Sequence, residues 1–215
     1  LAQNRAARAL VDAASYSVTT PLERVQTRFE KRDEAQFADA LSRAQRDAAK
    51  LEPKLQRLSA TLLAGEADRK RLGGLRWQAG YDLALGRALA AKVRTEGYNA
   101  MLAQAKQGMK FQNERNDTWV IRPSPAISGG SDLEKQAAKA EAYLSRVVAE
   151  HPGTPWAMLA ERELDAPLGW EWSEAFSNLA ARMARQAEAA NRPRREPRPP
   201  QNLPPRKPNP RPPRL

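Results

Sequence analysis

The segment from Leu75 to Gly108 carries a small or aliphatic residue at nearly every third or fourth position. This spacing keeps residues on one face of an α-helix, so the segment is predicted to form one long helix. Glycine inside a helix costs about 1 kcal/mol relative to alanine, and repeated glycines on one face therefore indicate that another backbone lies close to it. The residues predicted to make this helix contact are Ala79, Gly86, Ala90, Val93, Gly97 and Ala100.

A second periodic segment precedes this helix and is predicted to be its partner. Residues 20–23 (Thr-Pro-Leu-Glu) have the pattern of a capped helix start with proline at the first helical position. Pro53 is predicted to kink the helix, and residues 65–74 to turn the chain. The result is a long antiparallel, coiled-coil-like hairpin over residues 20–110, whose first arm packs bulky side chains on the small residues of the second. These bulky positions are Leu22, Val25, Phe29, Phe37, Leu41, Leu51, Leu55, Leu58 and Leu62.

Shorter helices are predicted after the hairpin. Ser131 begins a capping-box pattern, Thr154 precedes a proline as an N-cap, residues 167–172 form an aromatic turn, and residues 173–190 are amphipathic. The predicted fold is therefore all-α. Its predicted divisions are residues 1–19 (the end of an upstream helix and a linker), 20–110 (the long hairpin), 111–130 (a loop), 131–190 (a smaller, tetratricopeptide-like hairpin and a terminal helix) and 191–215 (a disordered tail).

The positive charge is concentrated at the C-terminus. The chain has a net charge of +11, of which residues 191–215 supply +7, so the part predicted to fold is only mildly basic. Ten prolines among these 25 residues exclude a packed core, and a disordered, partly polyproline II tail is predicted. Such a tail has the chemistry to contact a polyanion. The side chains concerned are Arg192, Arg194, Arg195, Arg198, Arg206, Lys207, Arg211 and Arg214.

Residues that could perform chemistry are few. The chain has no cysteine and one histidine, His151, so it lacks the ligands of a zinc site and a Ser-His-Asp triad. We interpret His151 as a cap at a helix C-terminus, where a cation is favoured. Asp82 and Glu96 have Arg87 and Arg94 as neighbours in the sequence, and we interpret them as structural or solvated ion pairs.

Cofactor sites and membrane spans are not indicated either. The glycine-containing runs lack the Gly-Lys-Ser/Thr ending of a phosphate-binding loop. No run approaches the roughly 18 apolar residues of a membrane span. We therefore expect no catalytic residue, no cofactor, no metal and no small-molecule substrate.

The tryptophans leave two interpretations open. Trp156, Trp170 and Trp172 are predicted to gather around the smaller hairpin. Buried aromatic side chains usually pack a core, and exposed clusters can instead line a groove that binds a peptide.

Several short segments have distinctive sequences, namely Thr20–Val25, Asp33–Phe37, Leu75–Gly86, Lys92–Glu96, Glu150–Trp156 and Pro167–Trp170. Together they resemble the C-terminal helical region of planctomycete-type bacterial proteins that carry a von Willebrand factor A domain, over roughly residues 15–172. Residues 140–164 are also similar to one tetratricopeptide-type hairpin. In such families the A domain binds a divalent metal through an Asp-x-Ser-x-Ser loop. Residues 12–17 have the wrong spacing for that loop, so we assign no metal ligand.

These features predict a protein-binding role rather than an activity. The leading hypothesis is a non-catalytic helical scaffold or protein-protein interaction region of a larger protein with a von Willebrand factor A domain. The chain starts within a helical pattern, so we expect it to be a piece of a longer polypeptide, and the resemblance implies that such a domain lies upstream. The alternative hypothesis is nucleic-acid or polyanion binding through the tail. The absence of cysteine fits any compartment.

Overall fold

A computed structural model describes residues 4–17 and 25–191. The chain divides into two units, Leu1–Leu179 and Ala180–Leu215. The predicted helix start at residues 20–23 and the tail residues from Arg192 onward lie outside the described residues. The elements are α1 (Arg5–Ser17), β1 (Arg28–Glu30), α2 (Glu34–Ala49), α3 (Glu52–Leu63), the 3-10 helix η1 (Glu66–Arg71), α4 (Leu75–Ala105), β2 (Thr118–Ser124), α5 (Ser131–Glu150), α6 (Pro155–Leu164), β3 (Gly169–Ala175) and α7 (Leu179–Asn191).

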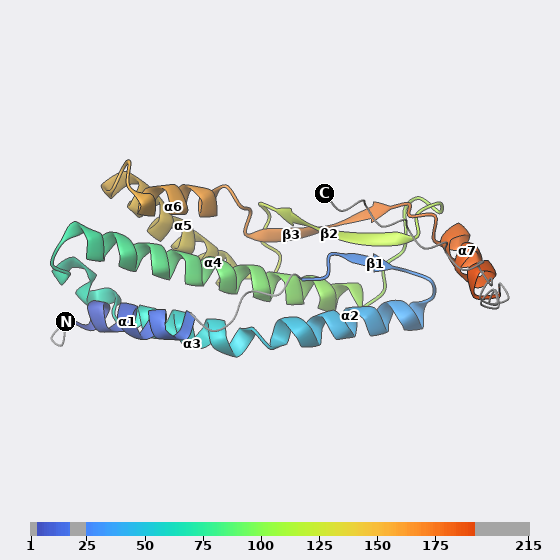
Figure 1. Cartoon of the computed structure of the whole chain (residues 1–215), viewed down its shortest axis with the longest axis horizontal. Helices are drawn as coiled ribbons and strands as arrows, with labels where there is room; N and C mark the ends of the chain where they lie inside the picture. Colours follow the sequence, from blue (N-terminus) through green and yellow to red (C-terminus); the bar gives the residue numbers. More distant parts are fainter. Residues whose placement is uncertain (1–3, 18–24, 192–215) are drawn as a thin grey trace, which may run out of the picture. The chain divides into compact units, whose positions relative to one another are not determined.

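The long helix α4 is the element on which the first unit is built. It starts at Leu75, the residue predicted from the sequence, and ends at Ala105, just before Gly108, which has a positive φ. Helices α1 to α3 pack on one side of α4, and α5 and α6 pack on the other (Figure 1). The described part of the chain is therefore mainly helical.

The small-residue face of α4 is buried, and its two glycines lie against elements other than the expected first arm. Ala79, Ala90 and Val93 are at most 1% exposed, and Ala100 is half-buried. A Cβ atom added at Gly86 would lie 2.7 Å from Leu144 Cγ of α5. At the remaining glycine of this face, Gly97, the nearest side chains would be Leu133 of α5 and Trp170 of β3. Gly86 and Gly97 thus face α5 and β3 instead of the first arm of the hairpin, whereas Ala90 and Val93 share a hydrophobic cluster with Leu62 of that arm.

Helix α2 meets a different, bulkier face of α4. Phe37 and Leu41 of α2 share one hydrophobic cluster with Tyr98 and Leu102 of α4, and all four are at most 2% exposed. A helix can bury two faces when its neighbours lie on opposite sides. The sequence pattern assigned the contact of α2 to the small residues of α4, whereas α2 packs against the bulkier Tyr98 and Leu102.

A three-stranded antiparallel sheet of order β1-β2-β3 corrects the all-α prediction. Phe29 lies in β1 and pairs with Trp119, which sits in the segment expected to be a loop. Trp119 also pairs with Glu174 of β3, where the expected terminal helix had already begun. Each strand has at most seven residues and pairs only with segments far away in the chain, so its local pattern is weak.

Helix starts and breaks follow local chemistry. Residues 28–30, which were expected to be helical, form β1, and helix α2 begins at Glu34, where the Asp33 side chain accepts a hydrogen bond from the Gln36 amide and caps the helix. Pro53 lies in the first turn of α3, and the chain breaks into two helices there instead of bending as one. Lys50, between them, keeps a right-handed helical conformation.

The smaller helices agree with the predicted boundaries in part. The Thr154 hydroxyl accepts a hydrogen bond from the Ala157 amide and caps α6, as predicted. The N-cap of α5 is Gly130, with a φ of 92°, so Ser131 does not cap that helix. The terminal helix, α7, begins at Leu179 rather than at residue 173.

Candidate functional site

A buried ion-pair network connects η1, α4 and α5. Asp82 of α4 is fully buried, and both of its carboxylate oxygens accept hydrogen bonds from Arg69 Nε, at 3.2 and 3.0 Å. Arg69 also donates to Glu150 at 2.6 Å, and Arg146 lies 3.7 Å from Asp82. The hydrogen bond from Arg69 holds the pKa of Glu150 below its usual 4.5. The charges of this network therefore compensate one another.

A second polar cluster lies on the same side of α4. Glu66 of η1 accepts hydrogen bonds from Lys139 Nζ at 2.8 Å and from the Tyr143 hydroxyl, both on α5. Burial raises the pKa of Tyr143, as does its hydrogen bond to Glu66. Tyr81 of α4 donates to the carbonyl of Leu62 at the end of α3. Each contact joins two elements, which indicates a structural cluster.

Arg94 fixes the segment that leads from α6 into β3. Its guanidinium forms an ion pair with Glu163 and donates to the carbonyls of Pro167, at 3.1 Å, and Ala166, at 2.9 Å. Arg87 also reaches Glu163, at 3.2 Å. The two arginines expected near Asp82 and Glu96 thus both bind α6. Glu96 instead pairs with Lys92, four residues before it, at 3.2 Å.

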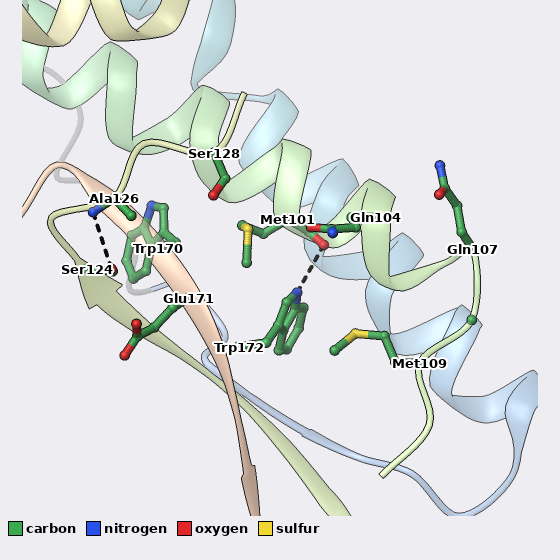
Figure 2. A pocket seen from close by; sticks show the side chains of 11 residues that line it. Met101, Gln104, Gln107, Met109, Ser124, Ala126, Ser128, Trp170, Glu171 and Trp172 are labelled. Atoms are coloured by element: carbon green, nitrogen blue, oxygen red, sulfur yellow. Dashed lines mark hydrogen bonds between the residues drawn. The ribbon is translucent and has the colours of Figure 1, made fainter. Parts of the chain in front are cut away.

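Two tryptophans attach β3 to the C-terminal half of α4. Trp170 Nε1 donates to the Arg94 carbonyl at 2.8 Å. Trp172 Nε1 donates to the Met101 carbonyl at 3.2 Å (Figure 2). The Trp172 ring also meets Phe29 edge to face, with centroids 5.6 Å apart. Trp156 lies elsewhere, beside Gly80 of α4. The three tryptophans expected in one cluster are therefore divided between two places.

A groove of about 610 Å³ lies between β3 and the last turns of α4. Its lining combines apolar side chains with hydroxyl and amide groups, and Figure 2 shows Trp170 and Trp172 pointing from β3 toward α4. The lining residues are Met101, Gln104, Gln107, Gly108, Met109, Ser124, Ala126, Ser128, Trp170, Glu171 and Trp172. The tryptophans could be identified from the sequence as candidates for a groove. The residues that α4 and the loop after β2 contribute could not, because no local sequence pattern marks them.

His151 has the position predicted for it. It is the C-cap residue of α5, 5% exposed, and its carbonyl accepts a hydrogen bond from the Thr154 hydroxyl at 2.6 Å. Within the described part of the chain, its Nε2 atom has no hydrogen-bond partner. This arrangement joins α5 to α6, and none of the clustered acids described above reaches the ring by a hydrogen bond.

The described residues contain no group of three or more His, Cys, Asp or Glu side chains that could hold a metal ion. Across residues 4–17 and 25–191, no helix has both the length and the apolar character required to cross a membrane. Comparison with family models, curated proteins and solved structures gives no match for this chain.

Proposed function

We propose that this chain is a non-catalytic helical scaffold that binds other proteins, as a region of a larger protein of the von Willebrand factor A type. In this proposal α2 and α3 form a long hairpin with α4, and α5 and α6 form a tetratricopeptide-like hairpin. Support comes from the contacts between these elements and from the sequence runs that resemble that family.

The observation that carries the proposal is how the buried charges are used. Arg69, Asp82 and Glu150 link η1, α4 and α5, and Arg94 with Glu163 links α4 to α6. Ionisable groups that serve catalysis are held with perturbed pKa values beside a space for substrate. In this chain the buried ionisable groups instead form ion pairs between helices. This favours a structural role, in which they hold a protein-binding surface in place.

The scaffold role is tested with the full chain as bait. Proteins that co-purify from cells of the source organism are identified, produced separately and titrated against the purified chain by calorimetry. A saturable complex of fixed stoichiometry is expected with at least one of them. The proposal is contradicted when no purified candidate binds and a substrate screen instead finds turnover by the purified chain.

A second candidate function, polyanion binding, is favoured by the charge distribution. Residues 191–215 supply +7 of the net charge of +11, from eight basic side chains and one acid. Counterion release makes such binding depend steeply on salt, with a slope of about −0.9 for each neutralised phosphate. The basic side chains, from Arg192 onward, lie outside the described residues, so this candidate function rests on the sequence.

If the tail neutralises about three phosphates of a DNA duplex, raising salt from about 50 to 200 mM weakens binding about fortyfold. Filter binding at several salt concentrations measures this slope. The matched control is a chain that ends at Asn191 and is expected to lose the binding. A flat salt dependence, or equal binding by the shortened chain, would rule out this candidate.

A further inference from the structure

The strand β3 lies at an edge of the sheet and exposes backbone groups that can form hydrogen bonds. Within the described residues, β3 pairs only with β2. The Ile121 amide of β2 donates to the Thr27 carbonyl, so the backbone hydrogen-bonding groups of Ile121 point toward β1. Those of its neighbours Val120 and Arg122 therefore point toward β3. The residues opposite them in β3 are Glu171 and Ser173. By alternation, the backbone N–H and C=O groups of Trp170 and Trp172 point away from β2.

The groove runs along this edge, and part of its lining is apolar. Met101 of α4, Trp172 of β3 and Met109, which follows α4, form this part. The indole N–H groups of both groove tryptophans are already donated to carbonyls of α4. They are thus occupied and cannot donate to the carbonyls of a polyproline II ligand, which favours a ligand that uses the free strand edge instead.

The charge around the groove favours a cationic ligand. Among its lining residues, all of which the structure describes, Glu171 is the one charged side chain, and it is exposed. Glu171 stands opposite Arg122 of β2 on one side, and its other side faces the free edge, where a cationic side chain of a bound strand can pair with it. The C-terminal end of α4 adds no negative charge, because its C-cap residue is Lys106 and the carbonyls of Leu102, Gln104 and Ala105 accept backbone hydrogen bonds.

We propose that this groove binds an extended, basic segment of a partner protein, which pairs with β3 as a fourth strand. The inference rests on the proposed scaffold function and names its binding site. Side chains of the bound strand alternate between the two faces of the sheet. One set, apolar, lies over Met101 and Trp172, and the other set, lysine or arginine, lies beside Glu171. The tail of this chain is also basic, but its many prolines lack the N–H that a strand pairing requires.

The proposal is tested with the full 215-residue chain and short capped peptides. An alternating valine and lysine peptide is expected to bind, as measured by calorimetry. An alternating valine and glutamate peptide should bind at least about tenfold more weakly, because its carboxylates lie beside Glu171. N-methylation of every second amide of the lysine peptide blocks the hydrogen bonds to β3 and should weaken binding by about tenfold or more.

Two charge-reversal variants locate the site. Glu171→Lys is expected to weaken binding of the lysine peptide about fivefold, because a favourable cross-strand pair becomes a repulsive one. Glu161→Lys makes the same change of charge on the exposed surface of α6, outside the groove, and should leave the affinity within about twofold. Circular dichroism checks that both variants are folded.

Each other outcome overturns the proposal. Absence of binding, equal binding of the N-methylated peptide, or equal effects of the two variants excludes strand pairing at β3. Dimerisation that Glu171→Lys abolishes identifies a second copy as the occupant. Much tighter peptide binding by a chain ending at Asn191 identifies the tail. If Glu171→Lys does not change the affinity of a purified partner, the groove is excluded while the scaffold function remains.

Discussion

Replacement of Arg69 by methionine is expected to lower the free energy of unfolding by about 3 kcal/mol. Methionine retains much of the apolar stem but leaves the fully buried carboxylate of Asp82 without its two hydrogen bonds from Nε. Removal of one partner of a buried ion pair typically costs about 3–5 kcal/mol, because the other charge stays buried. Arg146 still lies 3.7 Å from Asp82 and compensates part of the loss, so the lower end of this range applies.

Urea denaturation followed by circular dichroism at neutral pH measures this change. The matched control is Lys135→Met, which removes a surface pair with Asp132 whose side chains are 76% and 90% exposed. Such pairs contribute less than about 1 kcal/mol. The double variant Arg69→Met/Asp82→Leu removes both charges and is expected to be less destabilised than the sum of its single variants. A loss below about 1 kcal/mol for Arg69→Met would mean that the network contributes little.

The sequence predicted elements whose signal is local. Thr154 caps α6 because its hydroxyl bonds an amide three residues later, and the start of α4 at Leu75 follows the beginning of a helical repeat. The sheet could not be found in the same way. Trp119, Val120 and Ile121 have side chains typical of strands, but β2 acquires its partners only from β1 and β3, which are distant in the sequence. Pairing of this kind depends on the whole fold.

The same limit applies to the candidate site. The ion pair of Arg69 with Asp82 crosses from η1 to α4, and the contacts of Arg94 cross from α4 to the start of β3. The sequence placed Asp82 and Arg94 on one helix and offered no basis for choosing partners on other elements. The tryptophans of the groove were identified as a packing or peptide-binding feature, and the structure places two of them beside an unpaired strand edge. The residue types of the candidate site could be identified from the sequence, but their positions in the fold could not.

Gly86 gives the second large expected effect, since Gly86→Leu should lower the free energy of unfolding by about 2 kcal/mol. A Cβ atom there would lie 2.7 Å from Leu144 Cγ and 3.3 Å from the Ala140 carbonyl oxygen, and Leu144 is 1% exposed and has little space to move. Overpacking of a buried contact costs about 1–3 kcal/mol, and the better helix propensity of leucine recovers less than about 1 kcal/mol. Thermal and urea unfolding measure the change.

Gly80→Ala is the matched control, because it adds a methyl group on the same helix where space exists. The new Cβ would lie 3.6 Å from Leu10 Cδ2 and 3.8 Å from Trp156 Nε1, which are ordinary contacts. The gain in helix propensity should therefore raise stability by about 0.5–1 kcal/mol. Changes of opposite sign in the free energy of unfolding for Gly86→Leu and Gly80→Ala are expected only if α5 lies directly against Gly86. A melting temperature that Gly86→Leu leaves unchanged or raises would place that face in solvent and remove the contact that joins α4 to α5.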